Sequence, residues 1–309
     1  MDGSHKTVLL SEATEALITR RDGYYVDGTF GRGGHSREIL GQLEAGGHLL
    51  AVDKDLQAME AAAELADSEP RFGFEHGSFV QLPQHLQQRQ VAAVDGILLD
   101  LGVSSPQLDE GERGFSFQNS GPLDMRMDTS QGQTAAQWLA TVAHGDLARV
   151  LRVYGEERYA GRIAGAILRA REEAPLETTG QLAKVVTEAN PRWEQHKHPA
   201  TRAFQGIRIH INGELDELEQ FLASSLELLV SGGRLVIISF HSLEDRIVKR
   251  FFRDMSRGRY VPAGVPIRDG DLDRQLRLVG KAVRAGAAEV DMNPRARSAI
   301  MRVAEKIGA

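Results

Sequence analysis

The chain contains no cysteine among its 309 residues. This absence excludes disulfide bonds, cysteine-ligated metals and a cysteine nucleophile. The sequence also lacks an apolar run long enough to span a membrane. Its N-terminus shows no basic segment followed by an apolar core, as a signal peptide would. We therefore expect a cytoplasmic enzyme without a membrane partner.

Positive charge is not in excess either, because the formal net charge is -6. The protein is therefore not a general binder of polyanions, and a nucleic-acid site must be a local basic patch. Two stretches qualify, His196–His210 and Arg246–Arg259, although a solvated basic face explains each equally well. Aromatic side chains near such a patch could stack on bases. The candidate contacts are Lys197, Arg202, Phe204 and Arg208, together with Phe115 in a long loop. Phe115 fits an anchor that pins this loop better than a stacking group.

Apolar segments alternate with helical patterns in the first third of the chain. This alternation predicts an α/β fold with a parallel, doubly wound sheet. The pattern returns near the C-terminal end with one more buried strand. The expected strands are Tyr24–Val26, His48–Val52, Arg71–Glu75, Val94–Asp100 and Arg234–Phe240.

The alternation stops between about Ser105 and Ile211, where no comparable apolar strand occurs. Residues 102–128 resemble a loop, and Thr134–Arg171 and Leu182–Ala189 have helical apolar faces. We interpret this region as a helical insertion. The sequence thus predicts one domain from residues 1–106 and 211–309, and an inserted domain at 107–210.

Several boundaries follow from capping signals. Ser11 or Thr14 should cap the first helix, and Asn212 should cap the helix after the insertion. That helix should end at Ser231–Gly233. Ser242 and Asp245 are spaced as a capping box. Two final strands are expected at Leu276–Val283 and Ser298–Glu305.

Polar residues stand where four of the predicted strands end. Asp27 precedes a glycine-rich turn, and Asp53, Asp100 and His241 follow later strands. Ligands of parallel sheets bind outside the carboxyl ends of the strands, so these groups mark the expected site. Each also has a local interpretation: Asp53 as a helix N-cap, Asp100 as a turn carboxylate and His241 as a locally satisfied ring. Phe79, after the third strand, either stacks on an adenine or belongs to the core.

The glycine loop, Gly28 to Gly34, fits a nucleotide-like cofactor better than a dinucleotide. The G-x-G-x-x-G fingerprint is matched poorly, and no phosphate-binding G-x-x-x-x-G-K-[ST] loop is present. A carboxylate at Asp53 could accept both ribose hydroxyls of a nucleoside cofactor. No metal site is expected, because His196, His198 and His210 have no acidic partner at matching spacing. A G-x-S-x-G hydrolase elbow is absent as well.

Together these segments resemble one family, the bacterial 16S rRNA cytosine-N4 methyltransferases (RsmH, formerly MraW). The resemblance runs in order along essentially the whole chain. It rests on the motifs DGTFGRGGHS, AVDKD, DLGVSSPQLD, RGFSF, GPLDMRMD, GEER, HPATRAFQ and SFHSLEDRIVKRFF, with HKTVLLSE near the start and NPRARS near the end.

The resemblance implies a class I fold that binds S-adenosyl-L-methionine (AdoMet), with a helical substrate-recognition insertion after the fourth strand. It implies methylation of N4 of one cytidine in the decoding region of small-subunit rRNA. The expected partner is either free small-subunit rRNA or the assembled ribosomal subunit. A homodimer is one possible oligomeric state. Beside Asp27, the cofactor-binding positions are expected to be Gly33, Gly34, His35, Asp53, Phe79, Asp100 and Gln107.

The residues suit that chemistry. Methylation of cytosine at C5 normally uses a cysteine adduct, so the lack of cysteine favours N4. The N4 lone pair is delocalised, and an acceptor for its N–H would localise it during transfer. We expect Asp100 or a neighbouring backbone carbonyl in this role, with Ser104, Ser105 and His241 shaping the cytosine pocket. The usual D/N/S-P-P-Y/F/W motif is missing, and Ser104-Ser105-Pro106-Gln107 stands near its place, which leaves the proton acceptor open.

Three other functions compete with this interpretation. A DNA amino-methyltransferase would share the cofactor half, and product analysis would separate it. An RNA-binding protein that retains the fold would bind without methyl transfer. A nicotinamide oxidoreductase would be revealed by spectroscopic detection of its cofactor.

Overall fold

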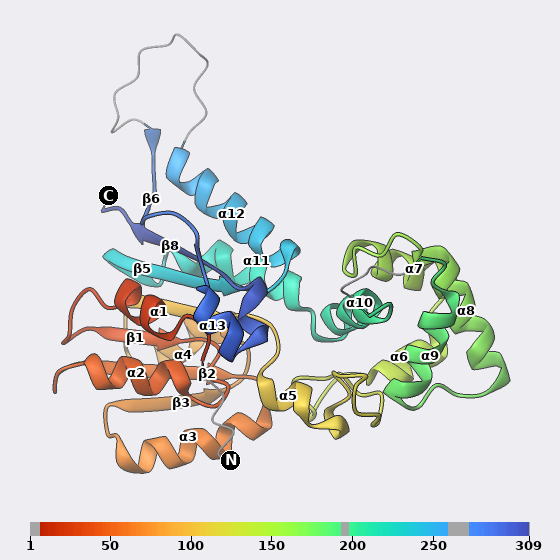
Figure 1. Cartoon of the computed structure of the whole chain (residues 1–309). Coiled ribbons are helices and arrows are strands. Elements are labelled where there is room, and N and C mark those ends of the chain that lie inside the picture. The colour runs from red at the N-terminus through yellow and green to blue at the C-terminus, as the bar shows by residue number, and fades with distance from the viewer. Residues whose placement is uncertain (1–6, 193–197, 259–271, 309) are drawn as a thin grey trace, which may run out of the picture. The chain divides into compact units, whose positions relative to one another are not determined.

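The structure is a computed structural model that describes residues 7–192, 198–258 and 272–308 (Figure 1). The chain forms two compact units. Unit 1 comprises Met1–Gly102 and Leu215–Ala309, and unit 2 is Val103–Glu214. The residues 103–106 and 211–214, expected in the sheet domain, thus belong to unit 2. None of the described helices is long and apolar enough to cross a membrane.

Unit 1 is built on one mixed sheet of eight strands. Its order is β3-β2-β1-β4-β5-β8-β6, and β7 pairs with β8. The first five strands are parallel, and β8 runs antiparallel to β5. This arrangement confirms the predicted doubly wound α/β sheet. The strands are β1 (Tyr24–Asp27), β2 (His48–Asp53), β3 (Phe72–His76), β4 (Val94–Asp100), β5 (Leu229–Ser239), β6 (Leu276–Leu278), β7 (Val283–Arg284) and β8 (Ile300–Lys306).

Helices cover both faces of this sheet, because successive strand side chains point to opposite sides. In β4, Leu98 packs in the core with α1, α2 and α3, whereas Ile97 and Leu99 pack in the core with α4, α11 and α12. All three side chains are fully buried. The helices of unit 1 are α1 (Leu10–Leu17), α2 (Gly34–Gln42), α3 (Leu56–Ser68), α4 (Leu82–Gln88), α11 (Glu214–Ser225), α12 (Ser242–Arg257) and α13 (Ala287–Met292), with 3-10 turns η1 (Phe79–Gln81) and η4 (Pro294–Ser298).

Unit 2 is helical and has a hydrophobic core of its own. Leu139, Leu151, Ile163 and Ile207 are buried together in that core. The segment 134–171, predicted to be helical, forms the three helices α6, α7 and α8. The elements are α5 (Ser105–Asp109), η2 (Gly111–Arg113), α6 (Ala135–Thr141), α7 (His144–Val153), α8 (Ala160–Glu173), α9 (Thr179–Ala189) and α10 (Thr201–Asn212).

Two predicted helix starts are wrong. The first helix begins after Leu9, which adopts a left-handed conformation without a side-chain cap. The Thr14 hydroxyl instead donates to the carbonyl oxygens of Leu10 and Ser11 inside the helix. Asn212 is the last residue of α10 rather than an N-cap, because Gly213 at φ 62° ends that helix.

The C-terminal half of unit 1 differs from expectation at three further places. Residues 231–233 do not end a helix: α11 stops at Ser225, and these residues belong to β5. The capping box of α12 lies one residue earlier than predicted and uses His241 and Glu244. The expected strand 276–283 is divided into β6 and β7.

Asn212 has a different structural role within unit 2. Its Oδ1 accepts a hydrogen bond of 2.7 Å from the Met127 backbone N–H, and its Nδ2 donates to the Met125 carbonyl oxygen at 2.7 Å. Met125 has a positive φ of 65°, which is unfavourable for a side chain of this kind. The Asn212 amide therefore fixes a strained loop to the end of α10.

We predict that Asn212→Ala lowers the free energy of unfolding by about 1–3 kcal/mol, because a partly buried N–H loses its acceptor. Trp138 of α6 belongs to unit 2, so urea unfolding followed by tryptophan fluorescence reports on this unit. Asn119→Ala, at an exposed position of the same unit, is the matched control and should change stability by less than about 0.5 kcal/mol. Equal effects of the two variants would refute the role of Asn212.

Candidate active site

The site lies at the carboxyl ends of the parallel strands of unit 1. β1 and β4 are neighbours at the centre of the order, and the chain proceeds outward from them in both directions. Such a switch point leaves a crevice beyond the strand ends, where ligands bind. Asp27, Asp53 and Asp100 are the last residues of β1, β2 and β4, respectively.

Asp27 is fully buried beneath the glycine loop. One carboxylate oxygen accepts from the Ser36 hydroxyl at 2.7 Å, and the other accepts from the Thr29 N–H at 3.2 Å. Burial raises the pKa of Asp27 to about 6, although these two hydrogen bonds oppose the shift. Asp27 therefore holds the loop to the start of α2 and has no oxygen exposed to solvent.

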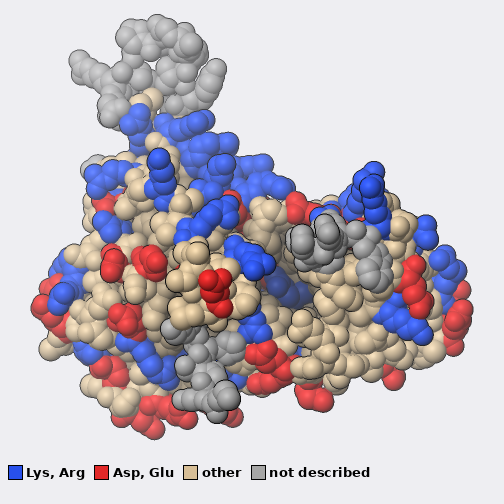
Figure 2. Space-filling view, viewed as in Figure 1, with Lys and Arg blue, Asp and Glu red and all other residues tan. Residues whose placement is uncertain are grey.

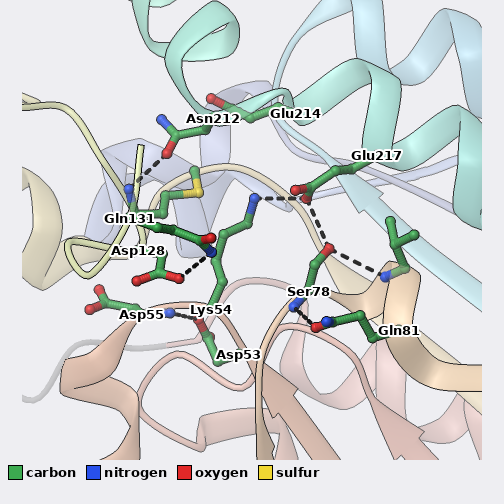
Figure 3. Close-up of polar contacts among 12 residues, drawn as sticks. Asp53, Lys54, Asp55, Ser78, Gln81, Asp128, Gln131, Asn212, Glu214 and Glu217 are labelled. Atoms are coloured by element: carbon green, nitrogen blue, oxygen red, sulfur yellow. Dashed lines mark hydrogen bonds and ion pairs between the residues drawn. The ribbon is translucent and has the colours of Figure 1, made fainter. Parts of the chain in front are cut away.

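Asp53 is held by backbone amides on both sides. Its Oδ2 accepts from the Gly31 N–H at 2.6 Å. Its Oδ1 accepts from the Asp55 N–H at 2.8 Å (Figure 3). Burial raises the pKa of Asp53, and these amides counteract the rise. A carboxylate oxygen can accept two hydrogen bonds, so both oxygens of Asp53 retain capacity for a further donor such as a hydroxyl.

The glycine loop needs several of its glycines for steric reasons. Gly33 has φ 76° and forms the left-handed N-cap of α2. A Cβ at Gly28 would lie 2.4 Å from Leu99 Cδ2, and one at Gly34 would collide with the Thr7 hydroxyl. The loop therefore packs directly on the strand ends and on the N-terminal segment.

Asp100 differs from the other two carboxylates because part of it lacks a partner. Its backbone N–H donates to the Thr29 hydroxyl at 2.6 Å. Its buried Oδ1 makes no hydrogen bond within the described residues. Burial raises the pKa of Asp100 well above its ordinary value, and the negative charges of Asp27 and Glu244 raise it further.

His35 lies beside Asp100, with its Nδ1 3.7 Å from Asp100 Oδ2. This separation is too long for a hydrogen bond. Burial lowers the pKa of His35 to about 4, so the ring is neutral near pH 7 and does not pair with the carboxylate. Its Nε2 is also buried without a hydrogen bond in the described part of the chain.

Phe79 and His241 have structural contacts at the same edge of the sheet. The Phe79 ring is buried edge-on against Phe221, with 5.5 Å between ring centroids. His241 is the N-cap of α12, and its Nδ1 accepts from the Glu244 N–H at 3.4 Å. Its Nε2, 3.2 Å from Glu244 Oε1, lacks the geometry of a hydrogen bond.

Ser104, Ser105 and Gln107 lie at the start of unit 2. Ser104 and Gln107 form a capping box for α5, in which the Gln107 side chain accepts from the Ser104 N–H at 2.8 Å. Ser105 is the first residue of that helix. Two of the three residues expected near the reaction thus stabilise a helix end within unit 2.

The structure corrects two of the expected RNA contacts. Phe115 and Phe204 are buried in the core of unit 2, with exposed fractions of 6% and 4%, so neither ring is available to stack on a base. Phe117, a partly exposed ring packed against this core, stacks on His198 with 4.4 Å between centroids.

The expected basic contacts have different surroundings. Arg202 is partly exposed and donates to the Glu156 carbonyl oxygen. Arg208 forms two hydrogen bonds of 2.8 Å to Glu214. Lys197 lies outside the described residues.

One polar network of unit 1 had no signal in the sequence. Lys54, next to Asp53, forms a 2.7 Å ion pair with Glu217 of α11, and the Ser78 hydroxyl donates to the same carboxylate at 3.0 Å (Figure 3). Glu217 thereby joins the ends of β2 and β3 to α11. These partners are separated by 163 and 139 positions in the sequence, beyond the reach of local patterns.

Comparisons with known proteins decide the family. A sequence model of the MraW methylase family matches residues 2–307. The chain belongs to the MraW methylase family. It is 56% identical over 309 residues to the ribosomal RNA small subunit methyltransferase H of Chromohalobacter salexigens, with 99% of this chain and 93% of that relative covered.

Similar solved structures include NSun6 from Pyrococcus horikoshii, at 15% identity and a TM-score of 0.46, covering 99% of this chain and 53% of that one. A SAM-dependent O-methyltransferase from Thermotoga maritima aligns at 8% identity and a TM-score of 0.42, covering 100% and 70%. These likenesses are too weak to support an inference. Membership of the MraW family and the sheet order confirm the predicted class I fold, and the chain is an AdoMet-dependent methyltransferase.

The strand-end residues fit that cofactor. AdoMet carries ribose hydroxyls and an amino group, which are hydrogen-bond donors. Asp53 has remaining acceptor capacity, and Asp100 has a buried oxygen without a partner among the described residues. An unsatisfied buried acceptor costs free energy unless a donor reaches it, so this edge of the MraW fold is chemically matched to AdoMet.

The raised pKa of Asp27 predicts a pH effect on stability. The folded protein keeps this proton up to about pH 6, whereas the unfolded chain releases it near its ordinary value of 3.8. Between these limits the folded state binds more protons, so the stabilisation present below about pH 4 is lost as the pH rises through about 6. We expect Asp27→Asn to reduce this fall by about 2–3 kcal/mol.

Urea unfolding at intervals from pH 4 to 7 measures this difference. Asp67→Asn, which removes an exposed carboxyl group from α3, is the matched control. An unchanged pH dependence in Asp27→Asn would contradict the assignment.

Proposed function

We propose that this enzyme transfers the methyl group of AdoMet to the exocyclic N4 of one cytidine in the decoding region of 16S rRNA. The observation that carries the proposal is the 56% identity, over 99% of the chain, to a protein whose name assigns it to small-subunit rRNA. The choice of N4 is supported by the resemblance of the segments DLGVSSPQLD and SFHSLEDRIVKRFF to cytosine-N4 methyltransferases. An rRNA substrate is consistent with a cytoplasmic enzyme. A homodimer stays a prediction.

In this proposal the cofactor is held by the glycine loop and the strand ends. Asp53 accepts the ribose hydroxyls, because its two oxygens are already oriented by the amides of Gly31 and Asp55. Gly33 and Gly34 let the backbone approach the ligand, and His35, Phe79 and Gln107 complete the expected set. Asp27 acts below them by holding the loop through Ser36.

Asp100 is the group proposed to act on the cytosine amino group. AdoMet supplies a methyl group on a positively charged sulfur. The Asp100 carboxylate accepts the N–H of the amino group, localises the nitrogen lone pair and takes the proton as the N–C bond forms. Its raised pKa makes it a stronger base than an ordinary aspartate. Ser104, Ser105 and His241 remain proposed to shape the pocket, and Lys197, Arg202 and Arg208 to contact the RNA.

Two substitutions separate the proposed roles. Asp100→Asn keeps the size of the side chain but removes the base, so single-turnover methyl transfer should fall by about 100-fold or more. The AdoMet dissociation constant should change by less than about 10-fold, which corresponds to roughly 1.4 kcal/mol. Calorimetry and rapid-quench transfer of a labelled methyl group measure the two quantities. Near-normal single-turnover rates would disprove the role of Asp100.

Asp53→Ala should have the opposite profile. We expect the AdoMet dissociation constant to rise about 10- to 100-fold, because two hydrogen bonds to a charged acceptor are lost. Transfer at saturating AdoMet should stay within about 10-fold of the wild type. A variant that binds AdoMet normally but transfers slowly would reverse this assignment.

A further inference from the structure

The helix α12 carries a row of basic side chains on its solvent face. Arg246, Lys249, Arg250, Arg253 and Arg257 are all exposed. Their spacing of three and four residues places them along one side of a helix. We call these five residues the α12 basic face. Figure 2 shows blue side chains gathered over the part of unit 1 where Figure 1 labels α12.

Acidic side chains do little to neutralise this face. The helix contains Glu244, Asp245 and Asp254. Glu244 is buried in the capping box, and Asp245 makes two hydrogen bonds to Arg302 of β8. Asp254 is the one exposed acid on the helix, and it pairs with its neighbour Arg253. The face is thus strongly positive on a protein with a net charge of -6.

Three members of the face are not engaged in folding. Lys249, Arg250 and Arg257 have neither an ion pair nor a side-chain hydrogen bond within the part of the chain that the structure describes. An exposed cation that lacks a partner contributes little to the stability of a fold. These cations are therefore available to a ligand of opposite charge.

The helix itself is rigidly attached to the sheet. Its opposite side buries Leu243, Val248 and Phe252 in the core of unit 1. The Met255 carbonyl oxygen accepts a hydrogen bond from the Gln275 N–H next to β6. The adjoining β6 adds the exposed Arg277, whose guanidinium contacts Glu305. The cations are therefore presented on a fixed surface rather than on a loop.

We infer that the α12 basic face binds the sugar–phosphate backbone of the substrate RNA, away from the reacting base. This inference rests on the proposed rRNA substrate. A rise of 1.5 Å per residue makes the row from Arg246 to Arg257 about 16 Å long, roughly the span of five nucleotides of one strand at about 3.4 Å each. Phosphate contacts position a nucleic acid without reading its sequence. The face supplies the local basic patch that an acidic nucleic-acid enzyme requires.

The test compares the triple variant Lys249→Gln, Arg250→Gln, Arg257→Gln with a charge-preserving control, Lys249→Arg, Arg250→Lys, Arg257→Lys. Methyl transfer to small-subunit particles and to bare 16S rRNA is measured over a range of KCl concentrations, and RNA binding is followed by fluorescence anisotropy. We expect the neutral variant to raise KM about 10-fold or more, with kcat within about two-fold, because these residues touch phosphates and not the reacting atoms.

The salt dependence gives a second readout. Loss of three phosphate contacts should reduce the slope of log Kobs against log salt by about two, and the control should keep the wild-type slope. AdoMet affinity, measured in parallel, should be unchanged in both variants if the fold is intact. An unchanged KM and salt slope in the neutral variant would overturn the inference.

Two further outcomes are distinguishable. If the neutral variant keeps normal RNA binding but loses binding to phosphatidylglycerol vesicles, the face serves an acidic lipid surface and the inference is wrong. If the wild type binds RNA with the expected salt slope but methylates neither substrate, the proposed function fails while the α12 basic face still stands. The two hypotheses can therefore be rejected separately.

Discussion

The structure depends on a costly arrangement of negative charge at the carboxyl ends of three adjacent strands. Burial raises the pKa of Asp27, Asp53 and Asp100; the charge of Asp53 adds to the rise at Asp27, and the charge of Asp27 adds to the rise at Asp100. Such a cluster persists in a folded protein only when hydrogen bonds or ligands compensate it. Asp27 and Asp53 receive these bonds from the chain itself, through Ser36, Thr29, Gly31 and Asp55.

Asp100 is the exception, and the exception is informative. The fold holds its backbone through Thr29 but leaves one buried carboxylate oxygen unsatisfied among the described residues. A neutral His35 next to it offers no positive charge, because burial lowers the pKa of that ring to about 4. The hydrogen bonds of Asp27 and Asp53 thus hold the glycine loop, whereas Asp100 keeps an acceptor for a donor from outside the described chain. A base is useful in that position because its raised pKa favours proton transfer.

The sequence was informative where the pattern was local. Compact apolar runs that end in an acid placed Asp27, Asp53 and Asp100 at the sheet edge, since a buried parallel strand has few other signatures. The spacing of Ser104 and Gln107 also predicts their capping box, because serine followed three residues later by glutamine is typical of that motif. Helix starts at Leu9 and His241 could not be foreseen, because neither residue is a preferred N-cap. The burial of Phe115 agrees with its alternative role as an anchor of the loop, whereas the burial of Phe204 depends on tertiary packing that no local pattern reveals. The Lys54–Glu217 pair joins segments far apart in the sequence and is equally invisible to local patterns.

We propose that this member of the MraW family uses its strand-end carboxylates to methylate a cytidine amino group in small-subunit rRNA. The most direct test is transfer of a radiolabelled methyl group from AdoMet to small-subunit particles, to bare 16S rRNA and to DNA, followed by nucleoside analysis. We expect the label in N4-methylcytidine from one or both of the rRNA substrates and none in DNA. Label in another nucleoside, or in DNA alone, would contradict it.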